Sequence, residues 1–522
     1  MAVAVRSLDA AATASDPARM AAVVSRNIAW SYASWAVSLA GPLITIPFYV
    51  RFLGHQMYGQ WLVILSLTSY LGLANLGMGQ TVSNRIAEAL AGGRRNRVGA
   101  LVSTAFYTYA AIGAGLIGAA AVLTPWVCRR YLSASTAVEQ AFLVYVVLIA
   151  LGFPLKVQQM ALRAFQRVDC DAGIEAAAGA GRILLVVIAL AGGLKLLAVA
   201  LLNGGTTLAG GLVAYLQALR LEPHSRPRLG HFSRRLLATM VKPSAAFFAL
   251  QIGFTLVLGI DNLVIGCVLG GAAVTRYAVP FRLMWIAAGL FSVAIGALTP
   301  TVTANYACER NELLQRGWVL SMRLGLLYAA AGAMLLWLAG PGFIRLWAGP
   351  GVMPSAATYA MQVLFFALLV CAAPSSTVLW ATSRHYGWAA LTLVEGTINL
   401  LLSIWGVRRW GLSGVIGATI LASLLTNAWF IPYAAITTLE IPLRMAVRAL
   451  APGAGLGLLA VALTLRMSDS ARALADASSA VAWLSAIALF VGIYFRVVFS
   501  HAERLTLWGW VGRCGNAIRG AA

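Results

Sequence analysis

The sequence consists of long apolar stretches separated by short polar segments. A helix that crosses the ~30 Å hydrocarbon core of a membrane needs about 20 consecutive, mainly apolar residues. The pattern therefore predicts an all-α polytopic membrane protein with about 14 transmembrane helices. Tight connections, such as the one at residues 192–193, leave about twelve or thirteen spans as alternatives. The predicted spans are residues 27–50, 61–82, 99–124, 138–158, 173–192, 194–216, 243–267, 277–302, 318–340, 356–380, 386–405, 412–434, 446–465 and 480–499.

A short sequence similarity indicates that the chain is built twice. Residues 52–54 close the first span and residues 268–270 close the seventh, and each is followed by a tyrosine, Tyr58 or Tyr277. Transporters with parallel repeats bind substrate between their halves. We therefore expect two six-helix lobes plus two C-terminal helices. The expected divisions are an N-terminal tail (1–26), an N-terminal lobe (27–216), a basic cytoplasmic linker (217–242), a C-terminal lobe (243–436), two extra helices (437–499) and a C-terminal tail (500–522).

The composition excludes a soluble globular protein. Hydrophobic residues make up 61% of the 522 residues and charged residues only 10%, against roughly 45–50% and 25% in ordinary soluble domains. The formal net charge is +22. Because these charges are scattered between apolar stretches and form no solvated basic face, nucleic acid is not an expected partner.

The Lys and Arg residues are divided unevenly between the loops. The alternate set of loops that includes both chain ends carries most of them, among them Arg94, Arg95, Arg97 and those in residues 220–242. Since cytoplasmic loops carry an excess of Lys and Arg, both termini are expected in the cytoplasm. The basic loops are also suited to binding anionic membrane lipids. The loops expected on the other side are short, so we expect no domain there.

The sequence lacks the motifs of enzymes that use a cofactor or a metal. Its three lysines, Lys156, Lys195 and Lys242, have no phosphate-binding Gly-Lys-Ser/Thr context. The histidines are too dispersed for zinc ligation, and the cysteines form no CxxC pair. We therefore expect no enzymatic activity, no cofactor and no metal site.

One motif, Asp169-Cys170-Asp171, matches the DxD pattern with which some glycosyltransferases hold a divalent metal and a sugar nucleotide. Two carboxylates at this spacing can share a hard cation. Two acids in a short polar loop explain the same residues, and no α/β nucleotide-binding domain accompanies them. We favour the polar loop.

Five charged residues inside the predicted spans stand out as candidates for function. A charge at the bilayer centre costs roughly 2.5–3.5 kcal/mol on insertion scales, so such residues usually face a protein interior or a watery cavity. A structural ion pair is the alternative. Arginine stays charged and binds phosphate bidentately, so Arg182 and Arg282 are expected to bind an anionic substrate such as a lipid diphosphate. Asp261, Glu395 and Glu175 are expected to be ion-coupling groups that take up a proton or a sodium ion.

Polar residues at helical spacing extend this expectation. Several stripes on different helices predict a shared hydrophilic cavity, and we expect Asn27 and Trp388 to line the substrate site with the two arginines. Close packing between helices explains the Ser, Thr and Gly members equally well. The stripes are Asn27, Ser31, Ser34 and Ser38; Glu175, Gly179 and Arg182; Arg282, Trp285, Gly289, Ser292 and Gly296; and Trp388, Thr392, Glu395 and Asn399.

Several short stretches in the first 310 residues keep a familiar order and spacing. Together they resemble the polysaccharide-repeat flippases (O-antigen and exopolysaccharide, Wzx-type) of the multidrug/oligosaccharidyl-lipid/polysaccharide (MOP) exporter superfamily. One departure is Asn75, where that family often has Asp. The matching stretches are residues 47–54 (PFYVRFLG), 58–61 (YGQW), 73–77 (LANLG), 85–89 (RIAEA), 260–266 (IDNLVIG), 269–270 and 277–282, with Pro300.

The resemblance implies a fourteen-helix fold and a transport function in the bacterial cytoplasmic (inner) membrane. The implied substrate is an undecaprenyl-diphosphate-linked oligosaccharide, moved from the cytoplasmic to the outer leaflet for lipopolysaccharide O-antigen, capsule or exopolysaccharide assembly. A polysaccharide polymerase and a chain-length protein are implied partners, besides membrane lipids. Arg282 and Asp261 lie on matching stretches. The resemblance therefore implies a place in the cationic cavity for Arg282 and a coupling role for Asp261.

Three other functions are weighed against this one. A multidrug extruder of the same fold favours acids and aromatics in its site, which the intramembrane arginines oppose. A membrane glycosyltransferase or polymerase needs a sizeable outer loop or an acidic catalytic pair on that side, and the sequence has neither. A flippase for the peptidoglycan precursor is a near relative and stays open.

Overall fold

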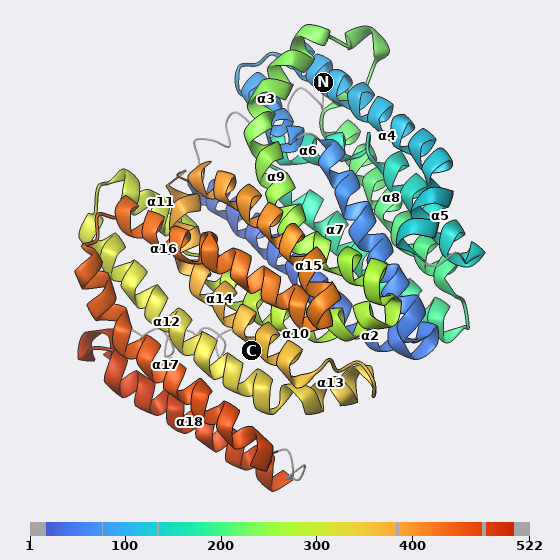
Figure 1. Cartoon of the computed structure of the whole chain (residues 1–522). Coiled ribbons are helices and arrows are strands. Elements are labelled where there is room, and N and C mark those ends of the chain that lie inside the picture. Colours follow the sequence, from blue (N-terminus) through green and yellow to red (C-terminus); the bar gives the residue numbers. More distant parts are fainter. Residues whose placement is uncertain are drawn as a thin grey trace. The chain divides into compact units, whose positions relative to one another are not determined.

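The computed structural model describes residues 17–75, 77–132, 135–382, 384, 386–471 and 477–505 (Figure 1). These residues form α-helices and short 3₁₀ helices joined by turns, and no strand occurs among them. The predicted all-α fold is confirmed. The chain divides into two compact units, Met1–Thr255 with Gly266–Thr275, and Leu256–Ile265 with Arg276–Ala522.

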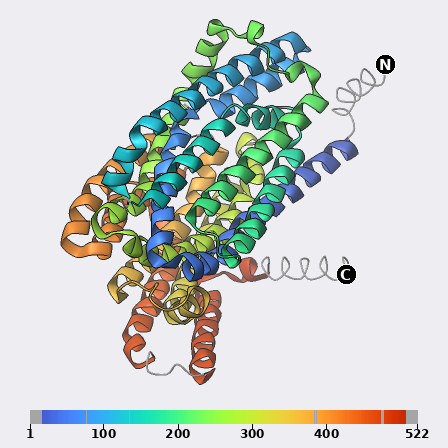
Figure 2. The same ribbon diagram turned by 90° about the vertical axis from the view of Figure 1, so that its right-hand side faces the viewer.

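The first unit is a helical bundle in which α2 packs along α7, and α5 packs against α4 and α8 (Figures 1 and 2). A buried apolar cluster that includes Ile86, Tyr109 and Phe153 joins α3, α4 and α6. The elements are α2 (Pro17–Ser69), η2 (Tyr70–Asn75), α3 (Met78–Ala91), α4 (Arg95–Tyr131), α5 (Thr136–Gly152), α6 (Lys156–Ala164), α7 (Val168–Ala191), α8 (Leu196–Leu221), η3 (Pro223–Ser225), η4 (Leu229–His231) and most of α9 (Arg234–Leu269).

The basic connection between α8 and α9 is held against α4. The Arg228 amide donates a hydrogen bond to Ser103 Oγ at 3.0 Å, and the Ser233 amide donates one to Thr104 Oγ1 at 3.1 Å. Ser225 is fully buried between these elements. Residues 222–233 therefore form an ordered strap that keeps its arginines beside the start of α4.

The second unit is built around α12, which packs against α14 and α17. α14 and α15 both contact α16, and α17 and α18 lie side by side as the red pair in Figure 2. Its elements are the middle of α9, α10 (Gly271–Gly296, from Arg276), α11 (Thr299–Ala307), α12 (Asn311–Leu338), α13 (Gly340–Ala348), α14 (Ala356–Ala381), α15 (Tyr386–Leu425), α16 (Asn427–Thr438), α17 (Leu443–Ala471) and α18 (Ala477–Val498).

The segment that follows α18 is fastened to α12 by an ion pair. Arg323 Nη1 lies 2.9 and 2.8 Å from the two carboxylate oxygens of Glu503, and its Nε donates to the Ala449 carbonyl on α17 at 3.1 Å. Tyr494 of α18 donates to the Arg323 carbonyl at 2.9 Å. Arg323 is therefore a charged residue inside an apolar helix whose charge has an acidic partner.

Two glycines make the same sharp turn between consecutive helices. Gly54 has φ 76° and ψ 166° within α2, and Gly270 has φ 81° and ψ 173° between α9 and α10. Positive φ values favour glycine because it has no Cβ. The similar sequences 52–54 and 268–270 thus share a backbone conformation, whereas the repetition of whole lobes stays a prediction.

The described residues contain ten helical stretches long and apolar enough to cross a membrane, or eleven if the bent pair Gln251–Val257 and Gly259–Leu269 is one span. Two of the ten, Ala29–Asn75 and Gly387–Thr438, are far longer than one crossing requires and contain the non-helical residues Gly54 and Gly411. The count of fourteen therefore stays a prediction, as do the domain boundaries.

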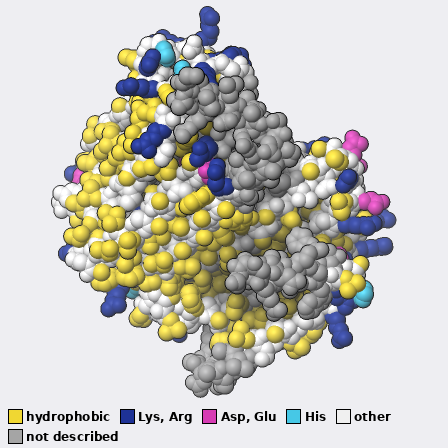
Figure 3. All heavy atoms as spheres, turned by 180° about the vertical axis from the view of Figure 1, so that it is seen from behind, with side chains coloured by type: hydrophobic (Ala, Val, Ile, Leu, Met, Phe, Trp, Pro, Cys, Tyr) yellow, Lys and Arg dark blue, Asp and Glu magenta, His cyan; other side chains and the backbone are white. Residues whose placement is uncertain are grey.

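The surface fits a membrane-embedded chain. On the face shown in Figure 3, hydrophobic side chains cover a broad continuous area, and many of the Lys and Arg side chains lie toward its edges. Exposed apolar patches of this extent mark a surface that contacts lipid or another protein. Together with the apolar helices, this identifies a multi-pass membrane protein.

Candidate functional site

A buried carboxylate in α9 is the centre of a polar network in the second unit. Asp261 is 6% exposed. Its Oδ2 accepts a hydrogen bond from the Tyr277 hydroxyl of α10 at 2.6 Å and lies 3.3 Å from Thr419 Oγ1 of α15. Its Oδ1 is buried and has no hydrogen-bond partner among the described residues. Oδ2 thus accepts hydrogen bonds from the protein, whereas Oδ1 can accept one from a bound ligand or can coordinate a cation.

The network continues along α15 through Asn399. Thr419 Oγ1 lies 3.1 Å from Asn399 Oδ1, which also accepts a hydrogen bond from Ser403 at 3.2 Å. Asn399 Nδ2 donates to the Val257 carbonyl of α9 at 3.5 Å. The two halves of α15 can face each other because the helix turns back at Gly411. This places oxygen atoms from α9, α10 and α15 around one buried position.

A second buried carboxylate, Glu395, lies one helical turn before Asn399 and is 5% exposed. Asn427, the first residue of α16, donates a hydrogen bond to Glu395 Oε2 and a second to Thr392 Oγ1, the latter at 3.0 Å. Ser423 and Thr426 also hydrogen-bond to the Glu395 carboxylate. Hydroxyl and amide groups therefore surround Glu395 as they surround Asp261.

Neither acid forms an ion pair with a Lys, Arg or His that the structure describes. Burying a charge without an ionic partner is costly, and a carboxylate in that situation gains a proton or a cation. Carboxylate, amide and hydroxyl oxygens are also ligands for hard cations. The arrangement is therefore suited to the reversible uptake of a small positive ion.

Two predicted substrate-binding residues lie elsewhere in the second unit. Arg282 is half-buried on α10, five residues after Tyr277. Trp388 is buried near the start of α15, where its ring makes an edge-to-face contact with Trp380 at 5.5 Å. Trp388 and Glu395 share one face of α15 by spacing, so this helix carries an aromatic group and an acid on the same side.

In the first unit, α7 presents the predicted pair Glu175 and Arg182 on one exposed face. The Arg182 guanidinium interacts electrostatically with the hydroxyls of Tyr49 and Tyr145. Tyr49 also lies 3.5 Å from Asn203 Nδ2. Arg182 has no ion pair with an acid in the described ranges, unlike Arg323 in the second unit. It is therefore able to bind an anionic ligand.

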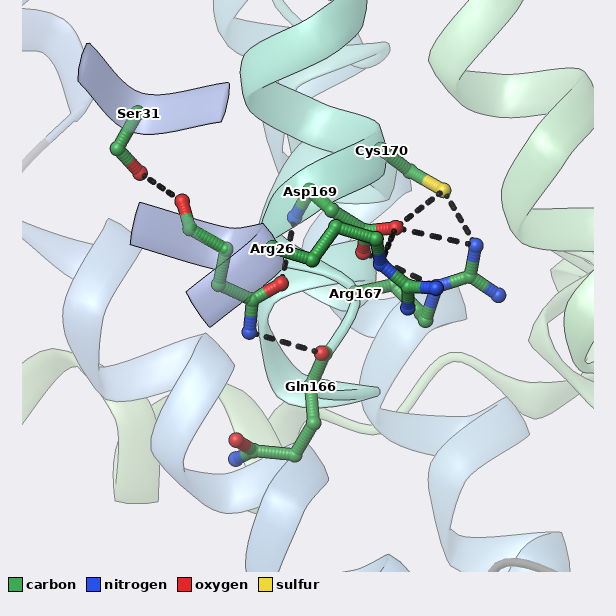
Figure 4. A network of polar contacts seen from close by, with 7 residues as sticks. Arg26, Ser31, Gln166, Arg167, Asp169 and Cys170 are labelled. Carbon is green, nitrogen blue, oxygen red and sulfur yellow. Dashed lines mark hydrogen bonds and ion pairs between the residues drawn. The ribbon is translucent and has the colours of Figure 1, made fainter. Parts of the chain in front are cut away.

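The structure places Asn27 in a helix contact. Its Oδ1 accepts a hydrogen bond from the Asp169 amide at 2.9 Å, and its Nδ2 donates to the Gln166 carbonyl at 3.5 Å (Figure 4). Asn27 thus caps the first turn of α7, and its amide is occupied by backbone groups. Its expected contact with substrate stays a prediction.

Both carboxylates of the DxD motif form ion pairs with arginine side chains. Asp171 Oδ2 lies 2.6 Å from Arg163 Nε, and Asp169 binds both Arg26 and Arg167. The hydrogen bond that the Arg167 guanidinium donates to the Asp169 carboxylate raises the pKa of Arg167, which precedes α7. No group of three or more His, Cys, Asp or Glu side chains suited to a metal occurs within the described ranges.

Sequence reasoning missed three side chains that hold the two acids: Tyr277, Thr419 and Asn427. From the sequence, Tyr277 is identified only as part of a repeated turn. Thr419 and Asn427 are polar residues eight positions apart within the predicted span 412–434, and the structure separates them into α15 and α16 with a break at Thr426. That spacing was the available signal, although it does not identify which acid each residue contacts.

The sequence matches the family described as "Polysaccharide biosynthesis protein" over residues 24–305. It is also 28% identical over 232 residues to the uncharacterized membrane protein EpsK of Bacillus subtilis (strain 168), a match that covers 43% of this chain and 46% of EpsK. The match thus spans less than half the length of that relative.

Solved structures establish the fold. The lipid II flippase MurJ in an inward closed conformation has a TM-score of 0.66 at 12% identity, covering 90% of this chain and 99% of that chain. An inward-facing multidrug resistance MATE transporter of the MOP superfamily has a TM-score of 0.60 at 14% identity, covering 79% and 99%.

These findings confirm the resemblance inferred from residues 47–89 and 260–300. The family match covers more than half of the chain, and the structures similar to it are transporters and flippases. The chain belongs to the polysaccharide biosynthesis protein family and has the fold of the flippases and transporters of the MOP superfamily.

Proposed function

We propose that this protein is a flippase that moves an undecaprenyl-diphosphate-linked oligosaccharide from the cytoplasmic to the outer leaflet of the bacterial inner membrane. It works by alternating access and makes or breaks no covalent bond. Both termini are in the cytoplasm, and a polysaccharide polymerase and a chain-length protein act on the product. The observation that carries the proposal is Arg182, an arginine in an apolar helix with no acidic partner among the described residues.

The substrate diphosphate binds to arginine. A guanidinium offers two parallel N–H donors to phosphate oxygens, and it stays charged inside a membrane. Arg182 supplies this group in the first unit, beside Tyr49 and Tyr145, and Arg282 supplies it in the second. Aromatic side chains have an apolar body and a polar tip, so Tyr49, Tyr145 and Trp388 suit contact with sugar rings.

Ion uptake at Asp261 and Glu395 drives the cycle. Two buried acids without a described cationic partner bind a proton or a sodium ion more tightly in one conformation than in another. Differential affinity of this kind is what a ligand needs in order to shift a conformational equilibrium. Glu175 is a third candidate, although it is exposed on α7 and should therefore bind an ion less tightly.

The peptidoglycan precursor is the alternative substrate, because it is also a lipid diphosphate with sugars and MurJ has a similar fold. Arg182 and Arg282 disfavour cationic drugs. Asp169 and Asp171 are paired with arginines, so neither carboxylate is free to bind the metal ion of a sugar nucleotide. This pairing disfavours a glycosyltransferase.

The test is transport by purified protein in vesicles loaded with fluorescent lipid-diphosphate oligosaccharide. Arg182→Gln and Arg282→Gln should each reduce transport roughly 10- to 100-fold, as expected when hydrogen bonds to a charged group worth about 1.5–3 kcal/mol are lost. Lysine at either position should restore part of it.

Matched controls are Arg85→Gln and Arg316→Gln, which remove exposed arginines that pair with Glu88 and Glu312. These should transport at the unmodified rate. Full transport by both intramembrane variants would refute the proposal, and preferential transport of the peptidoglycan precursor would favour the alternative substrate.

A further inference from the structure

A hollow on the first unit is not used by the proposed transport cycle. It is a cavity of about 490 Å³ between α7, α8 and Trp30 of α2. Its walls are formed mainly by small and apolar residues. They include Trp30, Gly173, Ala177, Gly181, Gly210 and Val213.

Part of the lining on α7 lies on the side away from Glu175 and Arg182. At 100° per residue, Gly173, Ala177 and Gly181 share one face, and Glu175 and Arg182 lie on the opposite face, whereas the lining residue Ala178 is one helical turn from Arg182. The lining runs from Asp169 to Gly181, a length of about 18 Å at 1.5 Å per residue. Because α7 and α8 are both candidate spans, this groove lies along the hydrocarbon region and has room for an extended apolar chain.

One end of the groove carries a cluster of charges. Asp169 lines the groove and is 8% exposed, and its Oδ2 lies 3.0 Å from Arg26 Nε of α2. Arg167 Nε lies 3.1 Å from Asp169 Oδ1, and Arg167 Nη2 lies 2.9 Å from Cys170 Sγ, another lining residue (Figure 4). Two guanidiniums therefore converge on one carboxylate at the end of an apolar groove.

The cluster has one positive charge more than its acids offset. Asp171 binds Arg163, whose side chain is 58% exposed, so the three arginines face two carboxylates, which leaves a formal charge of +1. A guanidinium has five N–H donors. Among the described residues, Arg26 contacts Asp169 through Nε, and its side chain is 49% exposed. Donors therefore remain for an anion at this end of the groove.

We propose that this groove binds an anionic phospholipid of the membrane. Its phosphodiester is held by Arg26 and Arg167, and one acyl chain lies against Trp30 and the small residues of α7 and α8. One phosphodiester charge matches the +1 of the cluster, whereas a lipid diphosphate carries more negative charge than the cluster offsets. The bound lipid also joins α2 to α7, since Arg26 lies on α2 and Arg167 directly precedes α7.

The test compares phosphatidylglycerol with phosphatidylcholine, which share a phosphodiester and acyl chains but differ in net charge. The full chain, stripped of lipid in detergent, is titrated with each, and bound lipid is counted by native mass spectrometry. We expect about tenfold tighter binding of phosphatidylglycerol. Equal binding of the two lipids would overturn the proposal.

Two variants separate the head group from the tail. Combined Arg26→Gln and Arg167→Gln should remove the preference for phosphatidylglycerol, whereas the exposed control Arg85→Gln should keep it. Gly181→Leu fills the groove without a backbone clash, because a Cβ there meets nothing within 4 Å. It should reduce binding of both lipids about tenfold, and the control Gly115→Leu, on an exposed and equally open position of α4, should not.

A fluorescence measurement that leaves Arg26 and Arg167 in place tests the proposal even if the arginine variants do not fold. Phosphatidylglycerol with brominated acyl chains should quench Trp30 fluorescence, so Trp30→Phe should lose a quenched component that the exposed control Trp126→Phe retains. Identical quenching of both proteins, or unchanged lipid binding by Gly181→Leu, would overturn the proposal.

Discussion

The buried carboxylates of the two units have different kinds of partner. At the start of α7, Asp169 and Asp171 are bound by three arginines that are at least one-third exposed, and the cluster has a formal charge of +1. In the second unit, Asp261 and Glu395 are buried among hydroxyl and amide groups. No described Lys or Arg pairs with either, so that network carries up to two uncompensated negative charges.

The contrast separates carboxylates that have ionic partners from carboxylates that have neutral partners. A carboxylate with arginine partners is stabilised in its charged state, and it holds the helices from which those arginines come. A buried carboxylate with neutral partners is stable only when it binds a positive ion. Buried carboxylates therefore fasten helices in one unit and are suited to bind an exchangeable ion in the other.

The largest effect is expected when the acids of the second unit are neutralised. Asp261→Asn and Glu395→Gln keep hydrogen-bond acceptors for Tyr277 and Asn427, so the fold should persist. Ion-driven transport in vesicles should fall roughly 5- to 150-fold, the usual range of a coupling free energy between sites. The exposed control Glu312→Gln should transport normally. Unchanged dependence on the ion gradient would place the coupling elsewhere.

A smaller effect, on stability and not on coupling, is expected for Asp169→Asn. This change leaves Arg26 and Arg167 close together without a shared anion, and we expect a loss of about 1–2 kcal/mol after allowance for exposure of both arginines. Thermal unfolding in detergent measures it. The control Glu88→Gln, at an exposed pair, should lose less than about 1 kcal/mol. If Asp169→Asn instead altered ion dependence at full stability, the two clusters would not differ as described.

The smallest effect is a difference in salt sensitivity. Raising the ionic strength from about 0.1 to 1 M shortens the screening length from about 10 to 3 Å. The stability difference caused by Asp169→Asn should shrink, because its arginine partners are reached by solvent. The effect of Asp261→Asn on stability should change little, since Asp261 is buried. Equal salt responses of the two variants would contradict this contrast in exposure.

Much of the fold follows from the sequence. The apolar stretches predict the membrane helices, and the all-α fold and family are confirmed. The count is less certain because α2 and α15 continue through turns at Gly54 and Gly411. A hydropathy pattern measures the length of an apolar stretch, and it does not report where a single glycine reverses the chain.

The site is predicted only in part, for a similar reason. Helical spacing identifies Glu395 and Asn399 as neighbours on one face, because that relation is local. The partners Tyr277, Thr419 and Asn427 reach the acids from other helix segments, and spacing along the chain does not determine such contacts. Asn27 shows the limit of helical spacing in another way. It lies at helical spacing from Ser31, Ser34 and Ser38, but its side-chain amide bonds to backbone groups at the start of α7.

The ion pair between Arg323 and Glu503 has a consequence for synthesis. The two residues are 180 positions apart, so at about 5–20 residues per second the ribosome makes Glu503 roughly 10–40 s after Arg323. During that interval an apolar helix already carries a charge whose partner does not yet exist. A chain cut short before residue 503 never gains the partner, and its α12 keeps an unneutralised arginine inside an apolar helix.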